Sequence, residues 1–388
     1  MSVILPGGTI GILGGGQLGR MLSLEARRMG YRVCVLDPDP RCPTAQVADD
    51  CVPGALGDAT AALELADRVA VATLDTEHVP AEVLDQMETR IPVRPSAAVL
   101  RTIQDRLSQK EFLARHGFPQ TNFRSVPDAA ALPAALEAIG APAVLKSRRA
   151  GYDGKGQARV ERGDDLAATF CKAGGVPAVL ESFVSFRAEI SVILARGANG
   201  DFRVYPVAEN VHRRHILHST RAPARIEPKV AERAVQTARD VADALGHVGV
   251  MAVEMFLLDD GGLYVNEIAP RTHNSGHYTF GACATSQFEQ HVRAICGLPL
   301  GDPALLSPAV MVNLIGDLWR VGRPDWSMVL SDPHVRLHLY GKAMAVDGRK
   351  MGHILVLDHD TDAAMQRAEA ILRKLEDAAG LSPEERRA

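Results

Sequence analysis

Two glutamates, Glu254 and Glu267, stand in neighbouring apolar runs that are joined by the turn sequence Asp-Asp-Gly-Gly. That pattern predicts an antiparallel hairpin. If Leu258 pairs with Leu263 across the turn, Glu254 pairs with Glu267, and their Cβ atoms lie about 5 Å apart. Carboxylates this close repel each other by about 3 kcal/mol at an effective dielectric constant of about 20. Mg²⁺ prefers one or two carboxylates plus substrate phosphates and would relieve that repulsion. We therefore predict a magnesium site here; a register slipped by one residue, with one glutamate in solvent, is the alternative.

The second run leads directly into a segment crowded with polar side chains. Between Asn266 and His277 the chain carries a carboxylate, side-chain amides, the guanidinium of Arg271 and the imidazole of His273. A buried strand needs no such density of polar groups for its packing. We interpret the segment as a candidate catalytic site.

Length and composition are those of an ordinary globular protein. The chain has 388 residues, of which 46% are hydrophobic and 23% charged, and its net charge is -4. This length predicts two or three domains. A slightly acidic chain has no general attraction for nucleic acid or for an anionic membrane, so we expect neither as a partner.

The six cysteines include no Cys-x-x-Cys pair, so we expect reduced thiols instead of a zinc site or a disulfide framework. The N-terminal residues lack the features of a signal peptide, and no apolar run reaches the length of a membrane span. We expect a cytoplasmic protein.

Three patterns follow one another along the chain, and they predict an α/β protein with domains at 1–105, 106–299 and 300–388. The first alternates strands and helices, as in a parallel Rossmann-like unit, at 9–13, 17–29, 31–36, 58–69 and 70–74. The second combines helices and strands at 105–117, 143–146, 177–181 and 228–245 with the glutamate hairpin. The third has short strands at 336–340 and 353–357 and a closing helix from about 361.

A glycine-rich turn at 14–19 fits the G-x-G-x-x-G pattern between a strand and a helix, and Asp37 ends the next strand. This is the fingerprint of a dinucleotide site, which makes a nicotinamide-dependent oxidoreductase one hypothesis. The free amides of a helix N-terminus also hold other phosphates or anions, so the turn leaves the ligand open.

Two further segments have the composition of phosphate sites. Lys146 ends a strand and is followed by glycines up to Gln157, without the spacing of a Walker A loop. Near the C-terminus, Lys342, Arg349 and Lys350 flank a turn and could clamp a phosphate monoester. In both cases a solvated hairpin with exposed charges is the alternative. Glu181, at a strand exit, is a weaker indication of adenine or ribose binding.

In this order the motifs resemble those of the ATP-grasp enzymes, and among them the family of 5-(carboxyamino)imidazole ribonucleotide synthases of purine biosynthesis. The resemblance runs from about residue 9 to 357 and is most specific at 151–157 and 266–277. It implies a three-domain ATP-grasp fold with an N-terminal Rossmann-like domain, a small mostly-β C-terminal domain, and a glycine-rich lid at 146–157. It also implies a homodimer.

The reaction implied by the resemblance uses ATP to phosphorylate bicarbonate. The resulting carboxyphosphate carboxylates the exocyclic amine of 5-aminoimidazole ribonucleotide, and ADP and phosphate leave.

The resemblance assigns roles residue by residue. The implied ATP ligands are Arg106, Lys146, Gly151, Tyr152, Asp153, Gly154, Lys155, Gly156, Gln157, Glu181, Ser182, Phe183, Val184, Glu189, His212, Asn266 and Glu267. The implied ribonucleotide site comprises Gln17, Leu18, Glu77, Asp153, Arg271, His273, Asn274, Ser275, Lys342 and Arg349. The implied catalytic residues are Asp153, Lys155, Arg271 and His273. Among these, Arg271 would hold the carboxyphosphate and Asp153 would orient or deprotonate the amine.

The chain departs from the family pattern at a few positions. Thr76 and His78 flank Glu77 where an aromatic residue and an asparagine are usual, and Ala150 and His215 replace expected glycines. Three other functions remain open. They are a related ATP-grasp enzyme that uses formate and glycinamide ribonucleotide, the nicotinamide oxidoreductase, and a catalytically inactive nucleotide sensor. The histidine-rich segment argues against the first, and the glutamate pair against the second.

Overall fold

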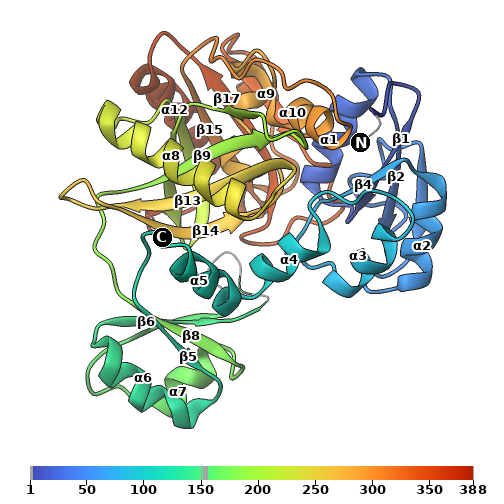
Figure 1. Ribbon diagram of the computed structural model, residues 1–388. Helices are drawn as coiled ribbons and strands as arrows, with labels where there is room; N and C mark the ends of the chain where they lie inside the picture. Colours follow the sequence, from blue (N-terminus) through green and yellow to red (C-terminus); the bar gives the residue numbers. More distant parts are fainter. Residues whose placement is uncertain (1–2, 150, 152–155, 388) are drawn as a thin grey trace.

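The computed structural model describes residues 3–149, 151 and 156–387. Its strands form three sheets, and Figure 1 shows the parts that they organise. The N-terminal part lies on one side and a small lobe projects away from the body. The strands of the C-terminal part extend the largest sheet.

The N-terminal part is a parallel sheet of order β3-β2-β1-β4, as the alternating pattern predicts. Residues 10–13, 33–36 and 71–74 of its strands are continuously buried because helices cover the sheet. They are β1 (Thr9–Leu13), β2 (Arg32–Asp37), β3 (Asp50–Pro53) and β4 (Val71–Leu74), with helices α1 (Gln17–Arg28), α2 (Ala59–Arg68), α3 (Ala81–Glu88) and α4 (Ala97–Gln104). Apolar residues of α1 pack against Phe288 and Val292 of α10 (Gln287–Ile295), which joins this part to the body.

Helix α5 (Arg106–Arg115) leads into the small lobe, an antiparallel sheet of order β5-β8-β6-β7. The lobe consists of β5 (Phe123–Val126), η1 (Ala129–Ala131), α6 (Leu132–Ile139), β6 (Ala143–Ser147), β7 (Gln157–Val160), α7 (Leu166–Lys172) and β8 (Ala178–Ser182). Leu132, Leu145, Phe170 and Leu180 share its hydrophobic core.

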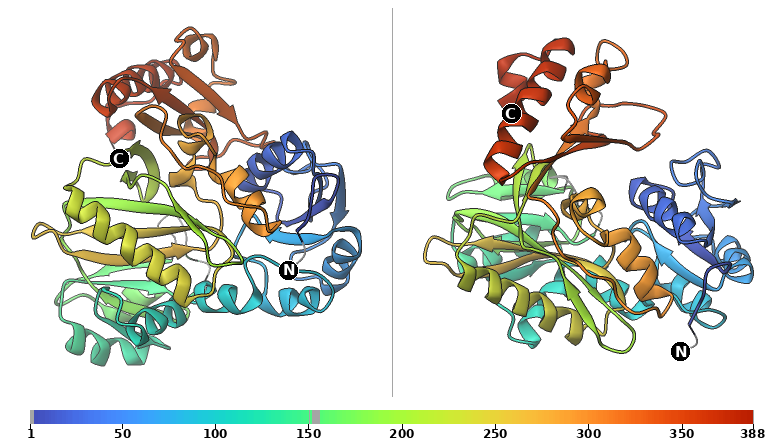
Figure 2. Two further views of the ribbon diagram at one scale, coloured as in Figure 1. Left: turned by 45° about the horizontal axis from the view of Figure 1, so that its top comes forward. Right: turned by 90° about the horizontal axis from the view of Figure 1, so that it is seen from above.

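The largest sheet runs in the order β14-β13-β9-β11-β12-β15-β17-β16, with β10 beside β9. Its strands are β9 (Ala188–Arg196), β10 (Phe202–Val204), β11 (Ala208–Arg213), β12 (Ile216–Ala222), β13 (Gly249–Leu257), β14 (Leu263–Ala269), β15 (Ala309–Ile315), β16 (Val335–Leu339) and β17 (Lys350–Leu357). Helices around it are α8 (Pro228–Ala244), η2 (Asn274–Gly276), α9 (Thr279–Ala282), η3 (Gly316–Trp319), α11 (Ser327–Leu330), α12 (Thr361–Ala378) and α13 (Pro383–Arg387). Because β12 pairs with β15, the sheet continues through the predicted domain limit near residue 300. In Figure 2 the strands that precede this limit lie beside the orange and red strands that follow it.

The glutamate hairpin confirms the predicted pairing but corrects its turn. Leu263 pairs with Leu257, so the prediction that it pairs with Leu258 is wrong. Leu258 belongs to the turn, where its amide donates to the carbonyl of Gly262 at 2.9 Å. A bulge in β14 then adds one unpaired residue, which compensates for the shift. Glu254 therefore still faces Glu267.

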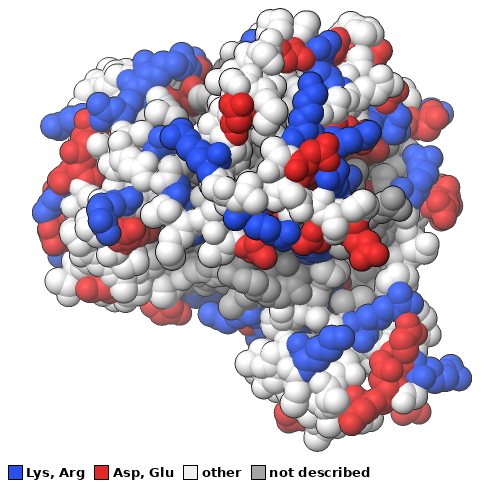
Figure 3. Space-filling view, turned by 180° about the vertical axis from the view of Figure 1, so that it is seen from behind, with Lys and Arg blue, Asp and Glu red and all other residues white. Residues whose placement is uncertain are grey.

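The outer surface matches the balanced composition. On the face drawn in Figure 3, lysines and arginines are interspersed with aspartates and glutamates. Among the described residues, no helix is long and apolar enough to cross a membrane.

Candidate active site

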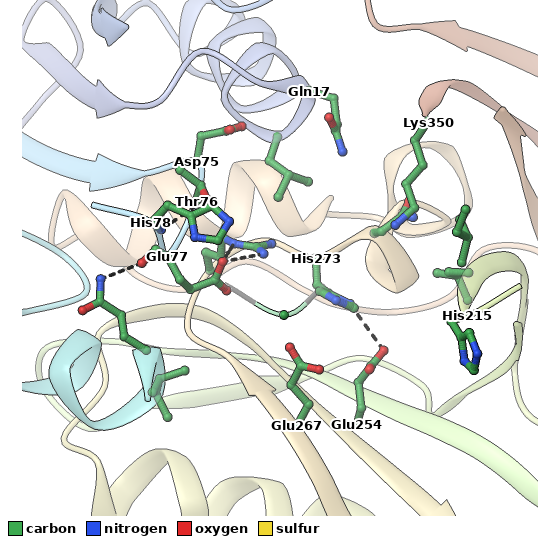
Figure 4. Close-up of a pocket in the computed structure, with 18 of the residues that line it drawn as sticks. Gln17, Asp75, Thr76, Glu77, His78, His215, Glu254, Glu267, His273 and Lys350 are labelled. Atoms are coloured by element: carbon green, nitrogen blue, oxygen red, sulfur yellow. Dashed lines mark hydrogen bonds and ion pairs between the residues drawn. The ribbon is translucent and has the colours of Figure 1, made fainter. Parts of the chain in front are cut away.

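A cavity of about 930 Å³ opens between the N-terminal part, α5, the large sheet and the turn before β17. This volume is large enough for a nucleotide-sized ligand. Many of the predicted site residues line it: Gln17, Leu18, Glu77, Arg106, Gly151, His212, Glu254, Glu267, Arg271, His273, Asn274, Lys342 and Arg349. Residues from three distant parts of the sequence thus meet in one space, as Figure 4 shows.

Other predicted residues are not part of its lining. They are Lys146, Gly156, Gln157, Glu181, Ser182, Phe183, Val184, Glu189, Asn266 and Ser275. The predictions for Tyr152, Asp153, Gly154 and Lys155, and the departure at Ala150, fall outside the described residues.

The paired glutamates form the acidic wall of the cavity (Figure 4). Burial, together with the charge of Glu267, raises the pKa of Glu254 to about 7. The Nδ1 atom of His273 lies 3.9 Å from a carboxylate oxygen of Glu254. Among the described residues no cluster of three or more His, Cys, Asp or Glu forms a complete metal site. Two hard oxygen donors that repel each other nevertheless fit Mg²⁺, which completes its shell with water and phosphate oxygens.

Arg271 follows β14 and reaches across the cavity to the N-terminal part. Its guanidinium donates to one Glu77 oxygen through Nε and Nη2, at 2.8 and 2.7 Å. Burial opposes its charge, but Glu77 outweighs this and raises the pKa of Arg271. Glu77 is in turn held by Gln104, whose amide donates to its backbone carbonyl at 2.6 Å. Glu77 therefore fixes the orientation of Arg271 even though Thr76 and His78 depart from the family pattern.

His273 is held in a neutral state beside the acidic wall. Burial, followed by the charge of Arg271, holds the pKa of His273 well below its usual range. Its Nδ1 atom is 2.9 Å from the hydroxyl of Ser275, which is fully buried and also accepts a hydrogen bond from Ser191. Ser275 thus contacts the ring of His273 from outside the cavity lining.

Asn274 lies on the cavity wall with both amide atoms buried and without a hydrogen-bond partner in the described structure. Arg106 presents a similar case at its Nε atom. Buried polar groups are normally satisfied, so both side chains are suited to ligand contacts.

Sequence reasoning missed Lys110, which forms a charge cluster with Glu181 and Lys146. A single oxygen of Glu181 lies 3.0 Å from Nζ of Lys110 and 3.2 Å from Nζ of Lys146. Burial disfavours the Glu181 charge, but these lysines, with Arg106, hold the pKa of its carboxyl well below the usual range. Burial lowers the pKa of Lys110 to about 8 against the opposing effect of Glu181. Glu181 therefore anchors Lys146, and the four-residue spacing of Arg106 and Lys110 on one helix face was the available signal.

Two contacts involve β11 and the turn that follows it. The Nδ1 atom of His212 lies 3.0 Å from a carboxylate oxygen of Glu189. Burial favours neutral imidazole, yet Glu189 raises the pKa of His212. His215 lies in the turn between β11 and β12, and its Nδ1 atom is 3.0 Å from the side-chain amide of Gln157.

The glycine turn at the start of α1 holds the protein's own carboxylates. The amide of Gly15 donates to Asp37 at 2.7 Å, and the amides of Gly16 and Gly19 donate to Asp75 at 3.1 and 2.6 Å. These are the amides that a pyrophosphate would take in a dinucleotide site. The geometry therefore does not favour the nicotinamide hypothesis.

The C-terminal cations form the wall opposite the glutamates, where Figure 4 shows Lys350 across from Glu254. Lys342 donates through Nζ to the carbonyl of Lys350 at 2.6 Å, and Arg349 donates to the carbonyl of Met344 at 3.0 Å. These contacts hold cationic side chains at the cavity edge.

Family models match most of the chain. They are described as a ribonucleotide synthetase preATP-grasp domain at residues 8–104, an ATP-grasp domain at 111–288, and a phosphoribosylaminoimidazole carboxylase C-terminal domain at 309–367.

Curated relatives match nearly end to end. The N5-carboxyaminoimidazole ribonucleotide synthase of Brucella melitensis is 46% identical over 90% of this chain and 96% of its own length. The protein of the same name from Bacillus subtilis is 41% identical over 94% of this chain and 95% of its own length.

Solved structures agree. An ADP complex of an N5-carboxyaminoimidazole ribonucleotide synthetase superposes with a TM-score of 0.90 at 41% identity, covering 97% of this chain and 99% of that one. The Aspergillus clavatus N5-carboxyaminoimidazole synthase, solved with ADP and 5-aminoimidazole ribonucleotide, gives a TM-score of 0.87 at 35% identity and covers 96% and 98%.

Proposed function

Because the chain belongs to the family of N5-carboxyaminoimidazole ribonucleotide synthases, ATP-dependent ligases of purine biosynthesis, we propose how its own residues carry out the reaction. The reaction is the ATP-dependent carboxylation of 5-aminoimidazole ribonucleotide. The proposal adds bicarbonate as the carbon source, carboxyphosphate as the intermediate, Mg²⁺ as the cofactor, and a role for each side chain.

The observation that carries the proposal is the arrangement of charge in one cavity. The two facing glutamates lie on one wall, and Arg271, Lys342 and Arg349 lie on others. Phosphoryl transfer needs little covalent help from the protein; it needs positioning and neutralisation of the transferring group. A site with both an acidic pair and separate cations can position the transferring group and neutralise its charge.

Glu254 and Glu267 are the proposed holders of Mg²⁺, whose charge offsets that of the ATP phosphates. Lys146 contributes a further positive charge, which Glu181 holds in place at 3.2 Å. Arg106, whose Nε atom has no partner in the described structure, is the proposed second contact to the nucleotide.

Arg271 is the proposed ligand of the carboxyphosphate, because Glu77 fixes its guanidinium at the cavity wall. Burial and Arg271 hold the pKa of His273 well below its usual range, so its neutral imidazole is the proposed hydrogen-bond partner of the ribonucleotide. The unsatisfied amide of Asn274 is the proposed contact to the ribonucleotide base or ribose. Asp153 and Lys155 keep the catalytic roles implied by the resemblance as predictions.

Lys342, Arg349 and Lys350 are the proposed clamp for the ribonucleotide phosphate. They stand together on the C-terminal side of the cavity, away from the glutamate pair. An arginine there supplies the charge-assisted, two-pronged contacts that a phosphate monoester takes.

Cellular location and assembly complete the proposal. All six cysteines are free, which is typical of a reducing compartment, so we infer that the enzyme acts in the cytoplasm. The homodimer stays a prediction, which analytical ultracentrifugation checks.

The experiment measures phosphate release from ATP in bicarbonate buffer, with and without 5-aminoimidazole ribonucleotide. We expect release to depend on the ribonucleotide and on Mg²⁺, and to stop in Glu267→Gln, which removes one ion ligand. The matched control is Glu232→Gln on the exposed face of α8, which should keep full activity. Release that requires formate and glycinamide ribonucleotide instead, or activity that survives Glu267→Gln at saturating Mg²⁺, would contradict the proposal.

A further inference from the structure

Asp317 is a buried acidic residue that does not line the cavity. It stands in η3, directly after β15, and only 5% of its surface is exposed. A buried carboxylate is costly unless its oxygens are satisfied, so its partners indicate what it holds.

The first partner is the turn that carries the phosphate clamp. The amide of Gly348 donates to Oδ1 of Asp317 at 2.9 Å. Next to it, the amide of Gly316 donates to the carbonyl of Arg349 at 2.8 Å. A Cβ atom on Gly316 would lie 2.0 Å from the carbonyl oxygen of Val346, so the backbones of η3 and this turn are in direct contact.

The second partner is Arg214, which lies in the turn between β11 and β12. Its Nη1 atom is 3.7 Å from Oδ2 of Asp317. The next residue, His215, lines the cavity and contacts Gln157. Arg214 also donates to the backbone carbonyl of Glu385 at 3.0 Å, so the C-terminal α13 supports the same turn from behind. One carboxylate thus contacts both turns that border the cavity.

We propose that Asp317 is a positioning residue for the ribonucleotide: it fixes the turn at Gly348 so that Arg349 and Lys350 face the cavity. Gly348 has a left-handed backbone, with φ 74, and its amide donates to the carboxylate of Asp317. A charged acceptor makes such a hydrogen bond stronger than a neutral one. This inference rests on the proposed function, because it requires that the clamp bind the substrate phosphate.

The test is steady-state kinetics of Asp317→Ala with each substrate varied separately. Loss of the bond to Gly348 should raise KM for 5-aminoimidazole ribonucleotide about tenfold, the effect of losing one charge-assisted hydrogen bond. KM for ATP should change by less than about threefold, because the 3.7 Å ion pair with the half-exposed Arg214 is weak and the carbonyl of Glu385 still holds that side chain. We also expect kcat to stay within about threefold. Asp317→Asn keeps an oxygen acceptor for Gly348 and should restore KM to within about threefold of the wild type.

The matched control is Asp325→Ala. Asp325 accepts the amide of Ser327 at 2.9 Å, a bond of the same kind and length, but it is exposed and does not line the cavity. We expect no change in either KM. If Asp317→Ala does not fold, Asp317→Glu keeps the charge but moves the acceptor, and the ribonucleotide KM should again rise.

Arg349→Ala distinguishes failure of the proposed phosphate clamp from failure of the proposed role of Asp317. If Arg349→Ala leaves the ribonucleotide KM unchanged, the clamp itself is wrong. If Arg349→Ala raises that KM but Asp317→Ala and Asp317→Glu leave it unchanged, the role of Asp317 is overturned. A fall in kcat or in melting temperature with both KM values unchanged would show a purely structural role and would also overturn it.

Discussion

Replacing Glu254 with glutamine tests the electrostatics of the glutamate pair without any substrate. In the folded protein, burial and then Glu267 raise the pKa of Glu254 to about 7 from a usual value of 4.5. Its side chain is only 16% exposed, so solvent screens the effect weakly. The difference corresponds to about 3 kcal/mol of lost stability when the group is charged.

The sign follows from where the proton is held. Below about pH 4.5 Glu254 is protonated in both folded and unfolded chains and costs nothing. Between about pH 4.5 and 7 the unfolded chain releases the proton while the folded protein keeps it, so stability falls as pH rises. Above about pH 7 the full cost is present and no longer changes.

The assay is urea unfolding of wild type and Glu254→Gln in metal-free buffer from pH 4.5 to 8. The variant, which has no charge to bury, should gain about 3 kcal/mol relative to wild type across this range. Adding Mg²⁺ at pH 8 should stabilise wild type more than the variant, because only wild type presents both carboxylates. A stability difference that stays constant with pH would refute the reasoning.

Three further changes test other parts of the structure. Glu181→Leu leaves the buried Lys110 and the partly buried Lys146 without their counter-charge and should lower the free energy of unfolding by about 3 to 5 kcal/mol, measured in urea; a loss under about 1 kcal/mol would contradict it. His215→Gly relieves a left-handed backbone at φ 64 and should raise stability by roughly 1 kcal/mol, yet raise KM for ATP by removing the contact with Gln157. An unchanged KM would mean that the contact is incidental. Gly16→Ala places a Cβ atom 2.4 Å from the Asp75 carboxylate and should lower the melting temperature by several degrees, and NAD should not restore it.

The glutamate pairing could be predicted because it depends on local information. An apolar alternation and a glycine turn fix which faces of a hairpin meet. The predicted start of the turn is wrong by one residue. Leu258 is apolar, like the strand residues before it, but its amide donates across the turn to the carbonyl of Gly262. The bulge that restores the pairing has no sequence signal of its own, because it depends on how β14 fits its neighbours.

Features that depend on distant pairing were not predictable. β12 pairs with β15 although the two strands lie far apart in the sequence, so the change of pattern near residue 300 did not indicate a shared sheet. The contact between Lys110 and Glu181 similarly joins α5 to β8, which are also far apart in the sequence. Asp75 directly follows the strand β4, and only the fold brings it to the glycine turn.

The continuous large sheet determines how the proposed metal site and the proposed phosphate clamp are spaced. Glu254 lies on β13 and Lys350 begins β17, and a series of hydrogen-bonded strands joins them. Each step between neighbouring strands is about 4.8 Å, a distance set by backbone geometry and independent of side chains. Insertions in surface loops can therefore accumulate over evolution without altering the span between the proposed metal site and the proposed phosphate clamp. Loss of the β12–β15 pairing would change that span, so this pairing constrains the site although it lies outside the cavity.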